Sequence, residues 1–149
     1  MSTKLVSACL VGVRCAYDGN HRSNHDVLEQ FKAGNLIPVC PEQLGGQPTP
    51  RSTAEICGGT GVEVLNGNAE VLEEDGTNVT ESFIKGAHEV LHIAQTLGIT
   101  AAIFKARSPS CGCGSIFDGT FSSNLVPGDG VTTALLKLHG ITVETEEGS

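Results

Sequence analysis

Short apolar segments separated by polar turns recur along the whole chain. Four of them, at residues 4–8, 36–39, 101–104 and 141–143, have the length and composition of buried strands. Three others carry apolar residues at helical spacing: residues 24–33, the stretch after Asn78, and residues 130–139. Strands that alternate with helices predict an α/β fold, Rossmann-like, with a mostly parallel sheet. We expect residues 1–149 to form one domain.

Smaller features of the pattern refine this fold. Residues 62–65 and 69–72 flank Asn66-Gly67-Asn68, which predicts a small β-hairpin. Asn78 has a glutamate three positions later, at Glu81, so we expect the central helix to begin with a capping box at Asn78. Residues 42–61 are rich in Gly, Pro and Thr, and this composition predicts mostly loop.

Composition narrows the class of protein. Hydrophobic residues make up 39% of the chain, which indicates a globular protein, and the formal net charge of −8 argues against a general DNA-binding role. The sequence has neither an apolar run of the roughly 20 residues that a spanning helix needs nor a signal-peptide pattern. We therefore expect a cytoplasmic protein without a membrane partner. The pattern does not fix an oligomeric state.

The six cysteines are the residues with the most informative positions. In a reducing compartment, clustered thiols more often bind metal or do chemistry than form disulfides. Cys9, Cys40 and Cys111 each come at or soon after the C-terminal end of a predicted strand. Because ligands bind at that edge of an open parallel sheet, we expect these three side chains to converge.

A set of sulfur ligands selects zinc, copper(I) or an iron–sulfur cluster. The chain lacks the paired Cys-x2-Cys spacing that is typical of structural zinc, but spacing alone does not decide between zinc and iron. Electron-transfer clusters normally take four thiolates. Three thiolates would leave one metal position open, where a substrate can bind.

Several short motifs follow one another between residues 5 and 147. They are Ser7-Ala8-Cys9-Leu10-Val11-Gly12, Cys15, Tyr17-Asp18-Gly19, Val39-Cys40-Pro41-Glu42-Gln43-Leu44-Gly45-Gly46, Pro48-Thr49-Pro50-Arg51, Ala54-Glu55-Ile56, Ser108-Pro109-Ser110-Cys111-Gly112, Ile116-Phe117-Asp118-Gly119-Thr120-Phe121 and Gly130-Val131-Thr132. In this order they resemble the thiouracil desulfidase family.

The resemblance implies a 4Fe–4S cluster held by only three cysteines, with the fourth iron free for the sulfur of the substrate. It also implies non-redox desulfuration of 4-thiouracil, or its nucleotide, to uracil or UMP and hydrogen sulfide. Cys9, Cys40 and Cys111 fall in the motifs and are the expected ligands, and Cys15 is the alternative ligand. Cys57 and Cys113 lie outside the family positions, and we expect them to pack or to neighbour the cluster.

The same motifs supply candidate catalytic residues. Glu42 follows Cys40 by two positions and is the expected base that takes a proton from the attacking water. Ser108 and Ser110 flank Pro109 beside Cys111, and we expect either hydroxyl to stabilise charge on the substrate ring. Lys105, Arg51 and the amides before Val131 are candidates for the phosphate of a nucleotide substrate.

Two other functions compete with this interpretation. His88-Glu89-Val90-Leu91-His92 matches the H-E-x-x-H pattern of zinc peptidases, and the cysteines themselves offer a second zinc site, so a zinc hydrolase is one alternative. Both histidines project away from the apolar stripe of their predicted helix, which favours a solvated face. The other alternative is a non-enzymatic metal-binding or redox-sensing module.

Overall fold

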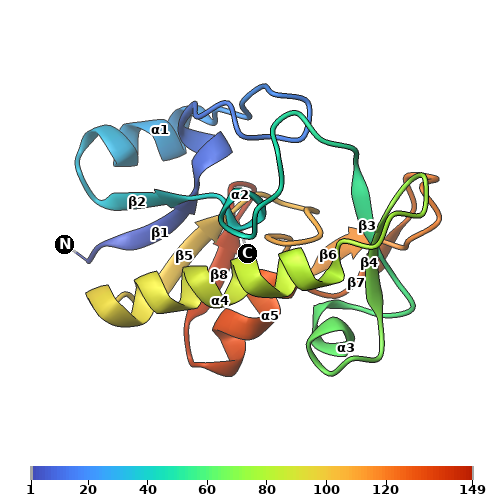
Figure 1. Ribbon diagram of the computed structural model, residues 1–149. Coiled ribbons are helices and arrows are strands. Elements are labelled where there is room, and N and C mark those ends of the chain that lie inside the picture. The colour runs from blue at the N-terminus through green and yellow to red at the C-terminus, as the bar shows by residue number, and fades with distance from the viewer. Residues whose placement is uncertain (1, 149) are drawn as a thin grey trace.

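The computed structural model describes residues 2–148 and has a parallel sheet at its centre (Figure 1). The sheet consists of β1 (Lys4–Ser7), β2 (Leu36–Val39), β5 (Ala101–Phe104) and β8 (Thr142–Thr145) in the order β2-β1-β5-β8. Each neighbouring pair is parallel, with Leu5 opposite Ile37 on one side and Ala102 on the other. The predicted α/β fold with a parallel sheet is confirmed.

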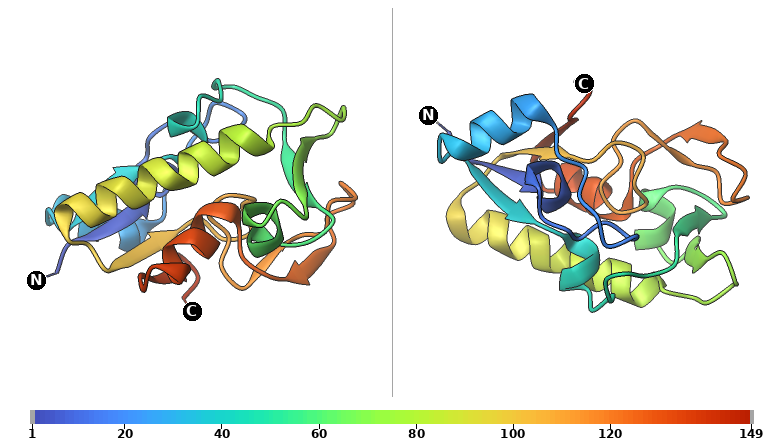
Figure 2. Two further views of the ribbon diagram at one scale, coloured as in Figure 1. Left: turned by 60° about the horizontal axis from the view of Figure 1, so that its bottom comes forward. Right: turned by 90° about the horizontal axis from the view of Figure 1, so that it is seen from above.

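Helices cover both faces of this sheet. Alternate strand residues face opposite ways, so Leu5 joins the larger core with α4 (Thr80–Leu97) and α5 (Val131–Leu138). Val6 faces the other way, into a smaller core against α1 (His25–Lys32). Figure 2 shows α1 and α4 on opposite sides of the sheet. No helix within residues 2–148 has both the length and the apolar character needed to cross a membrane.

The order of the strands places a crevice at one edge of the sheet. The chain runs outward from β1 in both directions, to β2 on one side and to β5 on the other. In doubly wound sheets, ligands bind outside the carboxyl ends of the strands at such a reversal point. Here β1 leads into a 3₁₀ helix, η1 (Ala8–Val11), and β2 leads into the short helix α2 (Pro41–Leu44).

A second region stands beside the sheet and is built from two antiparallel pairs (Figure 1). The strand β3 (Ala54–Cys57) pairs with β4 (Glu70–Glu73), and β6 (Ser115–Phe117) pairs with β7 (Leu125–Pro127). The helix α3 (Gly61–Leu65) connects β3 to β4. The prediction that residues 42–61 are mostly loop missed β3 and α2.

The predicted small β-hairpin is present as the antiparallel pair β6–β7, but its predicted position at residues 62–72 is wrong. Residues 62–65 belong to α3, because the carboxylate Oε1 of Glu63 accepts hydrogen bonds from the backbone N (2.6 Å) and hydroxyl (2.7 Å) of Thr60 and so caps this helix. Residues 69–72 overlap β4, whose partner is β3 rather than the preceding segment. An antiparallel pair is present in this part of the chain, but a helix stands between its strands.

The long helix α4 begins one residue later than expected, with its N-cap at Val79 instead of Asn78. Asn78 accepts a hydrogen bond from the backbone N of Thr80 at 2.9 Å, which is an Asx turn, and Val79 occupies the N-cap position. Asn78 therefore precedes the N-cap residue, and the predicted capping box at Asn78 is wrong.

Two glycines allow α2 and α4 to touch along their backbones. A Cβ atom at Gly86 would collide with the carbonyl oxygen of Pro41, and a Cβ atom at Gly45 would collide with that of Ser82. Larger residues at either position would push the helices apart. The contact therefore fixes α2, and with it Glu42 in its first turn, against the longest helix of the molecule.

Candidate active site

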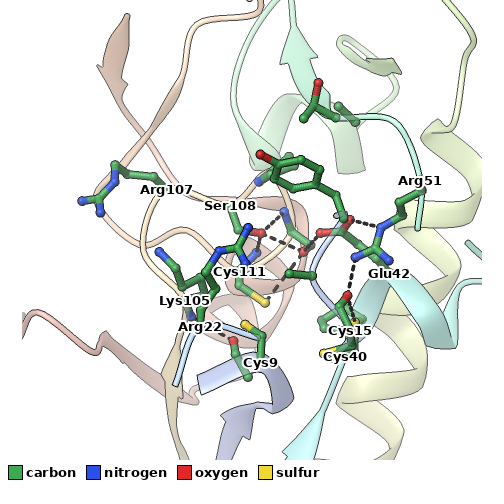
Figure 3. Close-up of a pocket in the computed structure, with 18 of the residues that line it drawn as sticks. Cys9, Cys15, Arg22, Cys40, Glu42, Arg51, Lys105, Arg107, Ser108 and Cys111 are labelled. Carbon is green, nitrogen blue, oxygen red and sulfur yellow. Dashed lines mark hydrogen bonds and ion pairs between the residues drawn. The ribbon is translucent and has the colours of Figure 1, made fainter. Parts of the chain in front are cut away.

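A cavity of about 490 Å³ opens at the carboxyl edge of the parallel sheet (Figure 3). The loops after β1, β2 and β5 form one wall, and β3 together with the β6–β7 connection forms the other. The cavity therefore lies where the two regions of the molecule meet. It gathers Cys9, Cys40 and Cys111, as well as Glu42, Ser108 and Ser110, on its surface.

The three predicted cysteines come from three different strand ends. Cys9 lies in η1, Cys40 is the N-cap residue of α2, and Cys111 lies in the loop after β5. Cys15 lines the same cavity, is only 2% exposed, and its side chain makes hydrogen bonds with those of both Cys9 and Cys40. The structure thus brings four thiols together, and the choice of ligands among them stays a prediction.

Three of these thiols, those of Cys15, Cys40 and Cys111, resist ionisation because their pKa values are raised. Burial raises the pKa of Cys111 to about 12, although hydrogen bonds from Ser7 and Ser110 oppose that shift. The hydrogen bond with Cys40 lowers the pKa of Cys15, but the hydrogen bond with Cys9 and burial outweigh this effect and raise the pKa to about 11. The pKa of Cys40 is also raised, by its hydrogen bond with Cys15 and by burial. Thiolates packed this closely need a positive centre to compensate their charge.

The remaining two cysteines are not among the residues that line the cavity. The thiol of Cys57 donates to the carbonyl oxygen of Gly119 at 3.5 Å, and that of Cys113 donates to the carbonyl oxygen of Val143 at 3.4 Å. Both contacts belong to packing between neighbouring segments.

Glu42 is the centre of a chain of polar contacts in the cavity (Figure 3). Its Oε1 lies 3.0 Å from Nε of Arg51, and the side chains are only 16% and 5% exposed, respectively. Its Oε2 accepts a hydrogen bond from the hydroxyl of Ser110 at 2.9 Å, and the hydroxyls of Ser110 and Ser108 lie 3.0 Å apart. The three predicted catalytic residues are therefore connected through hydrogen bonds.

Arg51 has a structural position that sequence reasoning missed. Its Nη2 donates to the carbonyl oxygen of Cys15 at 2.8 Å, while Nη1 donates to the carbonyl oxygen of Pro48 and the hydroxyl of Thr49. With Nε on Glu42, the guanidinium connects the loop of Cys15 to the carboxylate. Its place in the Pro48-Thr49-Pro50-Arg51 motif was the available signal, but only the fold reveals the partners.

The loop that carries Cys111 is attached to the start of α5. The backbone N of Val131 donates to the carbonyl oxygen of Pro109, and that of Thr132 donates to the carbonyl oxygen of Ser110, both at 2.9 Å. The hydroxyl of Thr133 donates to the carbonyl oxygen of Cys111 at 2.8 Å. Before Val131, the backbone N of Gly130 donates to the carbonyl oxygen of Gly112 at 2.8 Å, and that of Gly128 donates to the carbonyl oxygen of Gly114 at 3.2 Å. Neither glycine lines the cavity, so the expectation that the amides before Val131 receive a phosphate is wrong.

Three cations line the cavity on the side opposite Arg51 (Figure 3). Each is paired with a carboxylate: Arg22 with Asp18 at 3.0 Å, Lys105 with Glu146 at 3.1 Å and Arg107 with Glu147 at 2.8 Å. The hydrogen bond from Arg22 lowers the pKa of Asp18, and that from Arg107 lowers the pKa of Glu147. Three basic side chains therefore line this side of the cavity, and each of them is paired with a carboxylate.

His88 and His92 lie on the exposed face of α4, as predicted, and neither lines the cavity. Within residues 2–148, no three His, Cys, Asp or Glu side chains are grouped in the arrangement that holds a single metal ion. The H-E-x-x-H pattern thus lies on a solvated face.

Comparison with known proteins places the chain in a family. Residues 5–148 match the sequence profile of the 2-thiouracil desulfurase family. The chain belongs to this family. It is 45% identical over 142 residues to the uncharacterized protein YbbK of Bacillus subtilis (strain 168), and the match covers 95% of this chain and 94% of YbbK.

A solved structure of a desulfidase has the same fold. The chain superimposes on the 4Fe–4S-dependent thiouracil desulfidase TudS with a TM-score of 0.86 and 38% sequence identity. The match covers 99% of this chain and 92% of TudS. The family resemblance inferred from the motifs is confirmed.

Proposed function

We propose that this protein removes sulfur from 4-thiouracil, or from its nucleotide, and releases uracil or UMP and hydrogen sulfide. Water supplies the oxygen that replaces sulfur, so the overall reaction needs no electrons. Membership of the 2-thiouracil desulfurase family and the likeness to TudS support this assignment. The observation that carries it is the hydrogen bond between Glu42 and Ser110, which connects a carboxylate to the residue next to Cys111 inside a cavity with converging thiols.

The donors on the cavity wall fit an iron–sulfur cluster. Thiolates are the ligands that such clusters take. Buried thiols with raised pKa values lose their protons only when a positive metal centre compensates the charge of the thiolate. Cys9, Cys40 and Cys111 are the proposed ligands, with Cys15 as the alternative. When bound, a 4Fe–4S cluster with one open iron supplies a Lewis acid that makes the thiocarbonyl carbon electrophilic.

The chain itself supplies a base and a positioning system. Glu42 takes the proton of the attacking water, and the ion pair with Arg51 fixes the orientation of its carboxylate. Ser110 and Ser108, joined at 3.0 Å, direct their hydroxyls toward the oxygen or nitrogen of the substrate ring and stabilise charge there. Gly45 at the end of α2 and Gly86 in α4 allow the two helices to touch, and this contact keeps the base in place.

Under this proposal, both the free base and its nucleotide are substrates. Arg22, Lys105 and Arg107 line the cavity, and a phosphate competes there with the carboxylates that now pair with them. Arg51 is excluded from this role because its guanidinium is nearly buried against Glu42. Comparing 4-thiouracil with its monophosphate in one assay measures this preference.

The central test is anaerobic desulfuration by protein that carries its cluster. We expect about four iron and four sulfide per chain, and release of hydrogen sulfide from 4-thiouracil. Glu42→Gln retains the iron and loses turnover by about 100-fold or more. Glu81→Gln, an exposed glutamate of α4, is the matched control and keeps full activity. A fully active Glu42→Gln protein would refute the role of Glu42, and cluster-loaded wild type without desulfuration would favour a non-enzymatic metal module.

The ligand set is tested by iron content. We expect Cys9→Ser, Cys40→Ser and Cys111→Ser to lose iron, whereas Cys57→Ser and Cys113→Ser, which lie outside the cavity, keep it. Cys15→Ser decides between the two sets: retained iron supports Cys9, Cys40 and Cys111, and lost iron places Cys15 among the ligands.

A further inference from the structure

Aromatic side chains are scarce in this protein and gather at the cavity. The chain has five phenylalanines, one tyrosine and no tryptophan. Tyr17, Phe117 and Phe121 all line the cavity, the two phenylalanines from the wall opposite the thiols. Half of the aromatic residues thus face one site, although the large core offers ample room for them elsewhere.

Phe121 has an unusual backbone. Its φ angle is +57°, in the left-handed region that bulky residues rarely occupy. Glycine and asparagine adopt this conformation more readily, so a phenylalanine here costs stability that another residue would not. Such strain persists where the surrounding structure holds it, and it concentrates at ligand sites.

Glu55 holds this strained loop in place. From β3 on the neighbouring strand pair, its carboxylate Oε1 accepts hydrogen bonds from the backbone N of Gly119 at 2.9 Å and of Phe121 at 3.2 Å. A Cβ atom at Gly119 would lie 2.6 Å from the carbonyl oxygen of Ile56, so the loop lies directly against β3. One partly buried carboxylate therefore fixes the backbone that carries the ring of Phe121.

The other aromatic residues are less suited to contact a buried ring. Tyr17 is 46% exposed and its ring lies 5.7 Å from the guanidinium carbon of Arg22. Phe117 belongs to β6 and is fixed by the pairing of that strand with β7. Phe121 alone has a strained backbone and an anchoring carboxylate that is itself part of the cavity wall.

We propose that Phe121 is the stacking surface for the pyrimidine ring of the substrate, and that Glu55 is its positioning residue. This inference rests on the proposed function for the identity of the ring. A flat aromatic wall opposite the thiols places the thiocarbonyl sulfur toward the cysteines and leaves the ring edge to the serines. Stacking tolerates different substituents on the ring. Phe121 therefore contributes affinity and orientation, while the polar residues discriminate between substrates.

Variants at Phe121 separate the ring from the backbone strain. Phe121→Asn removes the ring and keeps a residue that tolerates the left-handed conformation, so the loop keeps its fold. Base–aromatic stacking is worth a factor of about 5 to 150 in affinity. We therefore expect Phe121→Asn to raise KM for 4-thiouracil and Kd for uracil by that factor, with kcat unchanged. Phe121→Tyr keeps the stacking face and stays near wild type.

The role of Glu55 is tested by asking whether the effect of its substitution requires the ring of Phe121. Glu55→Ala frees the amides of Gly119 and Phe121, so their hydrogen exchange accelerates and KM rises, whereas Glu55→Gln keeps an acceptor oxygen and restores most of the binding. Because Glu55 acts through the ring, Glu55→Ala combined with Phe121→Asn binds no more weakly than Phe121→Asn alone. Glu73→Ala on β4 is the matched control and leaves exchange and KM unchanged.

The outcomes distinguish this inference from the proposed function. Wild-type protein that carries its cluster but neither binds uracil nor desulfurates 4-thiouracil contradicts the proposed function. Wild-type protein that does both, with Phe121→Asn equal to it in KM and Kd, overturns the stacking role. Additive effects of the Glu55 and Phe121 substitutions overturn the positioning role and leave Phe121 as an independent contact.

Discussion

The two regions that enclose the cavity are stabilised in different ways. The parallel sheet lies between helices, and residues such as Leu5, Val6 and Phe104 in it are completely buried. The paired strands β3–β4 and β6–β7 depend more on single polar side chains: Glu63 caps α3, and Glu55 holds the loop of Phe121. The thiols stand on the first region, and the proposed stacking wall belongs to the second.

This difference indicates that the two regions have different roles in the proposed function. A cluster needs ligands at fixed separations, and strand ends in a packed sheet provide them. A substrate pocket needs a shape that can be adjusted by changing a few hydrogen bonds, and loops held by carboxylates provide that. Substitutions in the sheet region should therefore affect stability first, and those in the other region should affect substrate binding first.

The largest expected effect comes from deleting a ring in the sheet. Phe104 in β5 is 0% exposed, so Phe104→Ala should lower the free energy of unfolding by about 3–5 kcal/mol. The comparison variant Phe121→Ala, at a partly exposed loop residue, should lower it by less than half as much. Urea unfolding of both proteins measures the difference, and equal losses would contradict the division between the regions.

The contact between α2 and α4 should show a smaller loss of stability than Phe104→Ala, together with a loss of activity. Gly86→Ala places a methyl group against the carbonyl oxygen of Pro41 and should destabilise the protein by about 1–3 kcal/mol. Because α2 shifts with Glu42, kcat should fall more than the stability change explains. Thr96→Ala, at an exposed position of the same helix, is the control and should leave both quantities near wild type.

The smallest effect concerns the cap of α3 and depends on pH. Hydrogen bonds from the hydroxyl and backbone N of Thr60 lower the pKa of Glu63 below its usual value. A carboxyl whose pKa is lowered by folding adds stability above its unfolded pKa, and this contribution disappears as the pH falls through the folded pKa. Glu63→Gln should therefore have a slightly lower Tm at neutral pH, and the difference should vanish in acid. A difference that persists unchanged at low pH would show that charge is not involved.

The sheet region was predictable because its signals are local and repeated. The strands at residues 36–39 and 101–104 coincide with β2 and β5, and Asn24 accepts a hydrogen bond from the backbone N of Val27 at the start of α1. Strand ends then placed Cys9, Cys40 and Cys111 at one edge, where the structure has them.

The second region was mispredicted because its elements depend on distant partners. β3 is four residues long in a stretch rich in turn formers, and only its pairing with β4 makes it a strand. The alternation of apolar and polar side chains at residues 62–65 is typical of a strand, but the capping contact between Thr60 and Glu63 begins a helix here, and this capping pattern was present in the sequence. The roles of Arg51 and Glu55 arise from contacts 36 and 66 residues apart in the chain, which no local pattern encodes.

The attachment of the Cys111 loop to α5 has a consequence for recovery from damage. The carbonyl oxygens of Pro109, Ser110 and Cys111 accept hydrogen bonds from the amides and a hydroxyl of α5, so contacts within the polypeptide hold the shape of the loop. Under the proposed function, a cluster lost from Cys111 to oxygen leaves behind a binding loop that is already formed. We therefore expect reloading with iron and sulfide to restore the site without refolding of the polypeptide.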